Sequence, residues 1–289
     1  MAIDVPVTFS CEEKLLFGII HCPGCPSRRG ILIIVGGPQY RVGSHRQFVL
    51  LARFLADNGI PVMRFDYRGM GDSEGEPRSF NEIDADVRSA IDVFFENQSD
   101  LEEVIIWGLC DAASAALFYA HQDKRVKGLV LLNPWVYTEE GAAKSILKHY
   151  YLQRLVSLDF WGKVARFEFN YNKAILSFLA LLVKVFKRNF HLPSKRASQG
   201  LDDSLTLSLP DRMRRCLGRF GHPVLLILSG NDLTADEFRD VVNGCPKWQA
   251  LLEADLVTRL ELEEADHTFS SAKWRKLVAE GTLDWVRRI

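Results

Sequence analysis

A cysteine stands between small residues at a position where a catalytic nucleophile could lie. The segment Gly108-x-Cys110-x-Ala112 matches the nucleophile-elbow pattern G-x-S-x-G, with Cys in place of Ser and Ala in place of the last Gly. Such an elbow places its nucleophile on a sharp turn at the start of a helix, where the free N–H groups of the first turn favour a thiolate. The alternative interpretation is an ordinary buried cysteine, since free cysteine is among the most buried residue types.

The segments around Cys110 predict a strand before it and a helix after it. The apolar run Val104–Trp107 is typical of a buried strand, and the alanine-rich stretch after Cys110 has high helix propensity. Apolar stripes at helical spacing occur at about 48–55, 87–95 and 272–287. Seven more strands are predicted at Val5–Ser10, Leu15–His21, Gly30–Val35, Pro61–Phe65, Val126–Leu132, Pro223–Leu228 and Val257–Leu262. Strands that alternate with helices predict an α/β fold, with a mostly parallel eight-stranded sheet and helices on both faces.

Composition indicates an ordinary globular protein. The 289 residues are 47% hydrophobic and 25% charged, with a net charge of −1, which excludes a general polyelectrolyte binder. We find no signal-peptide pattern and no apolar run near the ~20 residues that span a bilayer. Six cysteines in a chain of this length do not suggest a disulfide framework, and Cys22-x-x-Cys25 lacks the second pair of a zinc site. We therefore expect a cytoplasmic protein without a metal or cofactor, and a turn at Cys22-x-x-Cys25.

Three turns occur in the order found in α/β-hydrolases: Gly36-Gly37-Pro38, Asp66-x-Arg68-Gly69-x-Gly71-x-Ser73 and the elbow at Cys110. The first resembles the His-Gly-Gly-Pro turn of proline iminopeptidase-like members, with Val35 where those carry His. More narrowly, residues 36–47 and 108–114 resemble the exosortase A system-associated hydrolase 1 family, which accompanies bacterial exopolysaccharide and protein-sorting loci. The resemblance implies an α/β-hydrolase fold over nearly the whole chain.

The same resemblance implies a catalytic triad. In α/β-hydrolases the triad runs in the order nucleophile, acid, base, which here gives Cys110, Asp232 and His267. Each comes just after a predicted strand, and parallel sheets place their sites at that edge. His267 would take the thiol proton, and Asp232 would orient the imidazole. The alternative acids, whose positions match strand ends less well, are Asp66, Asp236 and Asp266.

Two backbone N–H groups are expected to bind the oxyanion of the reaction. In this fold one belongs to the residue after the nucleophile, here Asp111, and the other to the turn after the third strand. We assign the second to Gly37, because Pro38 has no N–H. The Asp111 carboxylate opposes a neighbouring thiolate, so we expect it to point away or to bind a substrate group. Gln39 and Trp135 are predicted to contact the substrate.

A cap is predicted between two parts of the core. The alternation of strands and helices stops at 138–204, where aromatic residues are frequent, so we predict a helical cap there and a hydrolase core at 1–137 and 205–289. Between Lys144 and Arg196 stand eleven basic and two acidic residues, a local balance of +9. These charges either solvate an outer face or meet an acidic partner or an anionic membrane. We find no nucleic-acid-binding motif.

These patterns support three hypotheses of function. The leading one is a cysteine-dependent acyl hydrolase, a thioesterase or carboxylesterase, because a cysteine nucleophile suits thioesters and activated esters. Coenzyme A and acyl carrier protein are the expected carriers of the acyl group. An acyltransferase would use the same triad and the same acyl-enzyme. A non-catalytic binding protein of the same fold is the third hypothesis, and a full triad argues against it. The oligomeric state stays open.

Overall fold

The computed structural model describes residues 2–37, 39–137 and 207–289. The chain divides into two units, Met1–Val136 with Ser208–Ile289, and Tyr137–Leu207. All described residues except Tyr137 and Leu207 belong to the first unit. The predicted helical cap at 138–204 and its basic excess fall outside the described residues and stay predictions.

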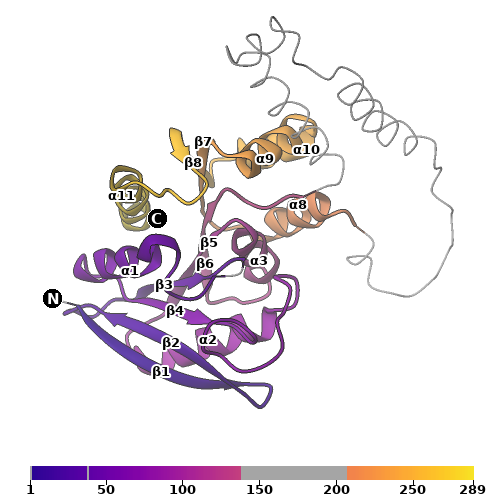
Figure 1. Ribbon diagram of the computed structural model, residues 1–289. Helices are drawn as coiled ribbons and strands as arrows, with labels where there is room; N and C mark the ends of the chain where they lie inside the picture. Colours follow the sequence, from indigo (N-terminus) through magenta and orange to yellow (C-terminus); the bar gives the residue numbers. More distant parts are fainter. Residues whose placement is uncertain (1, 38, 138–206) are drawn as a thin grey trace, which may run out of the picture. The chain divides into compact units, whose positions relative to one another are not determined.

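Eight strands form a single sheet in the order β1-β2-β4-β3-β5-β6-β7-β8 (Figure 1). β1 and β2 form an antiparallel hairpin, β2 pairs antiparallel with β4, and all other neighbours are parallel. This confirms the predicted eight-stranded, mostly parallel sheet. The strands are β1 (Ile3–Cys11), β2 (Lys14–Cys22), β3 (Arg29–Ile34), β4 (Val62–Asp66), β5 (Glu103–Leu109), β6 (Val126–Leu132), β7 (Val224–Asn231) and β8 (Val257–Asp266).

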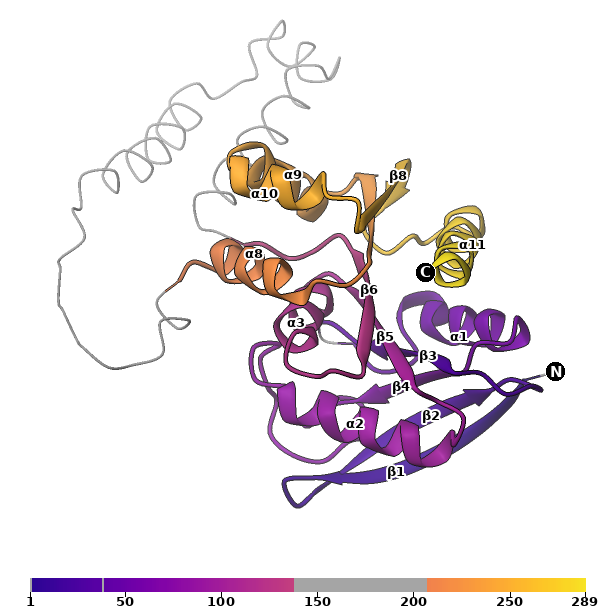
Figure 2. The same ribbon diagram turned by 180° about the vertical axis from the view of Figure 1, so that it is seen from behind.

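Helices cover both faces of the sheet, as predicted. Buried side chains of α1 and α11 form one core with the strands, and those of α2, α3 and α8 form the other (Figures 1 and 2). A short 3-10 turn precedes α1 at Ser44–Arg46. The described α-helices are α1 (Gln47–Asp57), α2 (Asp84–Asn97), α3 (Asp111–Ala120), α8 (Leu209–Phe220), α9 (Leu233–Asn243), α10 (Pro246–Leu252) and α11 (Ala272–Arg288).

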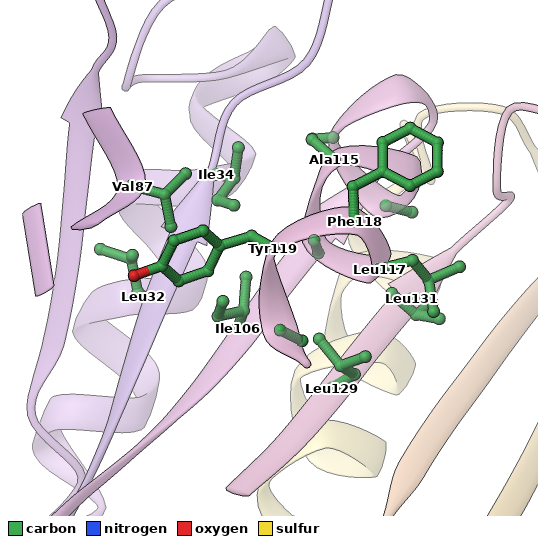
Figure 3. Packing of buried hydrophobic residues seen from close by; sticks show 14 of the residues in the cluster. Leu32, Ile34, Val87, Ile106, Ala115, Leu117, Phe118, Tyr119, Leu129 and Leu131 are labelled. Atoms are coloured by element: carbon green, nitrogen blue, oxygen red, sulfur yellow. The ribbon is translucent and has the colours of Figure 1, made fainter. Parts of the chain in front are cut away.

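Burial on both faces explains the unbroken apolar runs of the inner strands. In β3, Leu32 and Ile34 enter the core beneath α2 and α3, while Ile31 and Ile33 enter the core beneath α1 and α11. All four are fully buried. Figure 3 shows Tyr119 of α3 beside Leu32 in the core beneath α2 and α3. Each such side chain stabilises the fold by roughly 1.5–3 kcal/mol, so the strand ends that carry the site rest on a rigid base.

Other features of the described residues concern disulfides, membrane crossing and metal binding. All six cysteines are free thiols; Cys22 ends β2 and Cys25 lies in the connection to β3, where a turn was predicted. None of the helices in the described parts of the chain is long and apolar enough to cross a membrane. Within those same parts, no group of three His, Cys, Asp or Glu side chains could hold a metal ion.

Candidate active site

Cys110 lies on a strained turn between β5 and α3. Its backbone angles are φ 63° and ψ −123°, a conformation that costs a residue other than glycine about 1–3 kcal/mol. Hydrogen bonds hold the turn in place. The Cys110 N–H donates to the Leu132 carbonyl (2.9 Å), and the Cys110 carbonyl accepts from the N–H groups of Ala113 (3.1 Å) and Trp135 (3.2 Å). The half-buried thiol is therefore fixed at the N-terminus of α3.

Close packing of β5 against α3 explains the small residues around the cysteine. A Cβ at Gly108 would lie 2.6 Å from the carbonyl carbon and oxygen of Ala112, so no side chain fits there. Ala112 is 1% exposed, which shows that a methyl group is accommodated where related proteins carry glycine. Val35, the other departure from the family pattern, is buried in the core beneath α1 and α11.

Asp232 and His267 follow the ends of two neighbouring strands, β7 and β8. Asp232 is the N-cap of α9, where its carboxylate accepts hydrogen bonds from the N–H groups of Thr234 and Ala235, both at 3.2 Å. The Nδ1 atom of His267 lies 2.9 Å from Oδ2 of Asp232. The Asp232 side chain is only 6% exposed. Because its own N-cap contacts fix this carboxylate, it can hold the imidazole in one orientation.

The imidazole of His267 is held between an acid and a thiol. Hydrogen bonds to Asp232 and to Cys110 raise the pKa of His267 to about 10, against the opposing effect of burial. A positively charged imidazole beside a cysteine favours the thiolate, the nucleophilic form. The structure thus brings together Cys110, His267 and Asp232, the three residues predicted for the triad.

The alternative acids have other partners. Asp66 accepts the backbone N–H of Arg41 (2.6 Å) and pairs with its guanidinium. Asp236 pairs with an arginine one turn later in α9 (3.1 Å). Asp266 accepts the N–H of Ser270 (2.9 Å) and the hydroxyl of the same residue. Asp232 is therefore the acid that the geometry favours.

The predicted oxyanion donor Gly37 is already engaged by the side chain of Asp111, the residue that carries the second predicted donor. The Gly37 N–H donates to Oδ2 of Asp111 (2.9 Å), and the Ala112 N–H donates to Oδ1 (3.0 Å). Burial raises the pKa of Asp111, while the N–H groups of Gly37, Ala112 and Asp111 itself oppose this rise. The carboxylate thus turns toward backbone N–H groups, and whether it also binds a substrate group stays a prediction. The N-terminus of α3 and the glycine turn attract an anion, and the chain's own carboxylate supplies it.

The two predicted substrate contacts have roles within the protein. Oε1 of Gln39 accepts the N–H of Ser44 (3.2 Å), so its amide stabilises its own loop. Trp135 supports the elbow through its N–H, and its carbonyl accepts the hydroxyl of Ser114 (2.7 Å). Whether either residue also contacts a substrate stays a prediction.

The turn that carries Gly37 is tied to the second glycine loop. The guanidinium of Arg41 pairs with Asp66 and with Asp72 (2.6 Å to Asp72), and Asp66 also accepts the Asp72 N–H (3.2 Å). A Cβ at Gly71, where φ is +53°, would lie 2.2 Å from Oδ2 of Asp66, so this glycine leaves room for the carboxylate. The motif recognised in the sequence therefore organises the oxyanion turn and does not supply the acid.

Sequence reasoning missed one polar pair, Asn133 and Ser229. Both are fully buried. The Asn133 amide donates to Oγ of Ser229 (2.7 Å) and to the His267 carbonyl (3.1 Å), and it accepts the Ser229 N–H (2.9 Å). The Ser229 hydroxyl donates to the Asp266 carbonyl (2.9 Å). The pair therefore joins the ends of β6, β7 and β8. The available signal was an asparagine directly after a buried strand; its φ of 42° is one that asparagine tolerates.

Comparisons with known proteins agree with this architecture. The family model described as the alpha/beta hydrolase fold matches residues 31–269. Among curated proteins, the chain is 32% identical over 116 residues to the polyketide transferase grgF of a Penicillium species (38% of each chain), and 32% identical over 89 residues to the thiohydrolase aneE of Aspergillus aculeatus (29% of this chain and 28% of that protein). The matched stretches thus span well under half of both relatives.

Solved structures show the same fold over nearly the whole chain. An esterase of Pyrococcus furiosus, Pf2001, matches with a TM-score of 0.65 and 14% identity, over 99% of this chain and 91% of that chain. The α/β-hydrolase GrgF of Penicillium matches with a TM-score of 0.60 and 16% identity, over 99% of this chain and 98% of that chain. With a family model that matches most of its length, the chain belongs to the α/β-hydrolase family.

Proposed function

We propose that this α/β-hydrolase is a cysteine-dependent acyl hydrolase, which cleaves thioesters or carboxylic esters through an acyl-enzyme. The observation that carries the proposal is the contact series Cys110, His267, Asp232 at one edge of the sheet. These residues come from three separate strand ends, and each is held by backbone hydrogen bonds near the turn that carries it. A binding protein would have no need of such an arrangement.

The geometry supports the following chemistry. The Cys110 thiolate attacks the acyl carbon, and the negative charge moves to the carbonyl oxygen, near the N–H groups of Gly37 and Asp111. His267 then gives its proton to the departing thiol or alcohol, which leaves the acyl group on Sγ. In the second half, His267 takes a proton from water as the water attacks the acyl-enzyme. The products are a carboxylic acid and the regenerated thiolate–imidazolium pair, with Asp232 stabilising the charged imidazole throughout.

Acyl transfer is the second candidate function, and the activities named for two relatives support it. One curated relative is a polyketide transferase and another a thiohydrolase. Both activities can share one acyl-enzyme, because they differ only in whether water or another nucleophile attacks it. The choice between them therefore depends on the second step and not on the triad.

The carrier and the cellular setting are finer parts of the proposal. The resemblance of residues 36–47 and 108–114 to the exosortase A system-associated hydrolases supports a role beside exopolysaccharide or protein-sorting loci, in the cytoplasm. Coenzyme A and acyl carrier protein are the proposed carriers. The basic excess between Lys144 and Arg196 suits either of these anionic carriers, or an anionic membrane surface.

Intact-mass spectrometry after incubation with a panel of acyl thioesters and p-nitrophenyl esters tests the proposal. We expect the wild-type chain to gain the mass of one acyl group and Cys110→Ala to gain none. Cys25→Ser is the matched control, because Cys25 is an exposed free thiol outside the site. An acyl adduct that survives Cys110→Ala but is lost in Cys25→Ser would refute the assignment. Adding an amine or alcohol acceptor to the acyl-enzyme then distinguishes transfer from hydrolysis.

A further inference from the structure

The oxyanion site of this chain is already occupied by one of its own side chains. We define this site by the N–H groups of Gly37 and Asp111. The Gly37 N–H donates to Oδ2 of the Asp111 carboxylate, and the neighbouring N–H of Ala112 donates to Oδ1. An anion held by convergent backbone N–H groups is also what a tetrahedral intermediate would present there. The carboxylate and the reacting carbonyl oxygen therefore compete for the same donors.

The carboxylate is closely fitted to its position. A Cβ on Gly36 would lie 2.1 Å from Oδ1 of Asp111, so the absence of a side chain at Gly36 makes the room that the carboxylate fills. Burial raises the pKa of Asp111, and its charge contributes, after burial, to the raised pKa of Tyr67. These features show a half-buried carboxylate held among protein groups.

A plain acyl chain cannot take the oxyanion site without a penalty. Its carbonyl oxygen would take the Gly37 N–H from the Asp111 carboxylate and leave this half-buried charge beside Cys110 with the Ala112 N–H as its remaining donor from another residue. Charged groups that lose their hydrogen bonds in such places are strongly destabilised. A hydroxyl or amino group on the acyl chain changes this balance, since it can donate to the carboxylate as the carboxylate leaves. The displaced carboxylate stays within one side-chain length of the oxyanion site, so this donor must lie on the α or β carbon.

Building on the proposed function, we propose that Asp111 is a specificity-determining residue that selects acyl groups carrying a hydroxyl or amino group on the α or β carbon. The carboxylate exchanges its backbone N–H donors for the donor of the substrate, and no proton is transferred in the exchange. A substrate without that donor meets an occupied oxyanion site. The site thus distinguishes acyl groups by the partner that they offer to a half-buried charge, a basis on which enzymes reach high discrimination.

Matched thioesters test this selection. We compare the rate of Cys110 acylation by the N-acetylcysteamine thioesters of octanoic and 3-hydroxyoctanoic acid, in the wild type, Asp111→Ser and Asp111→Asn. The wild type should prefer the hydroxyacyl group by about tenfold or more, as expected for one hydrogen bond to a charged group. Asp111→Ser empties the site and should abolish this preference by accelerating octanoyl transfer. Asp111→Asn keeps the shape without the charge and should fall between the two.

Two results would overturn the selection. One is a wild type that acylates equally fast with both thioesters. The other is an Asp111→Ser variant that slows both by the same factor, which would make Asp111 a general contributor to catalysis. Thermal unfolding and the rate of Cys110 alkylation by iodoacetamide show whether each variant keeps the fold and its nucleophile.

A second measurement keeps the test independent of turnover. Octanal adds reversibly to a cysteine thiolate and forms a hemithioacetal whose oxygen needs the oxyanion site. Octanal should therefore protect Cys110 from iodoacetamide at about tenfold lower concentration in Asp111→Ser than in the wild type. Equal protection in the two proteins would refute the role of Asp111. Failure of all thioesters and esters to acylate Cys110, with this difference in protection intact, would refute the proposed function alone.

Discussion

The two halves of the candidate site are prepared to different degrees. In the acid–base half, Asp232 and His267 lie in hydrogen-bond contact, and the imidazole also contacts Cys110. In the oxyanion half, the N–H of Gly37 is already occupied by the Asp111 carboxylate. One half is thus assembled without substrate, whereas the other must exchange a partner before it can stabilise an oxyanion.

Both halves use the same physical device with different results. Asp232 is the N-cap of α9, and Asp111 stands in the first turn of α3, so backbone N–H groups at a helix N-terminus hold each carboxylate. Asp232 also meets the imidazole of His267, which makes its charge useful to the base. Asp111 meets the donors needed by the reaction. The role of each carboxylate therefore depends on the group that it contacts and not on its position at the start of a helix.

The largest expected effect comes from breaking the acid–base half. Asp232→Asn should slow acylation of Cys110 by up to ~10⁴-fold, because the amide favours the wrong tautomer of His267. Single-turnover kinetics with a thioester measures this rate. Asp236→Asn, which changes a carboxylate four residues away that pairs with Arg239, should have little effect. Similar rates for Asp232→Asn and the wild type would show that the acid lies elsewhere.

A smaller effect on activity is expected from removing Asn133, which positions the turn that carries His267. Asn133→Ala leaves the buried Ser229 N–H and the His267 carbonyl without a partner, which should lower the free energy of unfolding by roughly 1–3 kcal/mol. Turnover should fall as well, because the His267 turn loses its link to β6. Urea unfolding and steady-state kinetics measure the two changes. Asn97→Ala, which removes only one bond near the end of α2, is the control, and an equal loss in both variants would argue against a positioning role.

The pH dependence of stability tests the charge on His267. An unfolded histidine has a pKa of about 6.5, whereas the pKa of His267 is raised to about 10 in the fold. The folded state binds this proton more tightly. The resulting stability is fully present below about pH 6.5 and is lost as the pH rises through about 10. The wild type should therefore lose more of its Tm than His267→Gln on going from about pH 6 to pH 10.

We expect this difference in Tm to be about 2–4 °C, because the partial exposure of the imidazole weakens its interactions. Asp232 is the main cause of the raised pKa, so Asp232→Asn should remove most of the difference. Parallel loss of Tm in the wild type and in His267→Gln would mean that the imidazole is neutral in the fold at pH 7.

The smallest effect is expected outside both halves. Cys25 is an exposed thiol between β2 and β3, so Cys25→Ser should change the free energy of unfolding by no more than about 0.5 kcal/mol. Acylation of Cys110 should be unchanged. A large loss of activity would show that the β1–β2 hairpin side of the sheet also contributes to the site.

The sequence predicted the fold well because the inner strands are buried on both faces. Runs such as Ile31–Ile34 have no competing interpretation once turns and helices separate them. Cys110, Asp232 and His267 could be proposed because each directly follows such a strand, and parallel pairing brings strand ends together. Contacts at the site depend instead on side-chain directions, which strand order does not determine.

Asp111 and Asn133 show this difference. The sequence marked Asp111 as a complication for the thiolate but did not reveal that its carboxylate turns back onto the N–H of Gly37. Asn133 directly follows a predicted strand, but its partners, Ser229 and His267, are far away in the chain. Both positions depend on where distant segments meet in three dimensions.

The order of the strands also bears on how the protein folds and how it can evolve. The first five strands of the sheet all precede β6 in the chain, whereas Leu129 of β6 pairs with Val224 of β7, and the residues of the second unit lie between them in the sequence. Bringing together two strands so far apart in the sequence costs entropy, so we expect β6–β7 pairing to be a late event in folding. The closure term grows slowly with loop length, by about 0.6 kcal/mol for each doubling. The intervening segment can therefore lengthen, shorten or be exchanged during evolution with little change in the stability of the sheet that carries Cys110, Asp232 and His267.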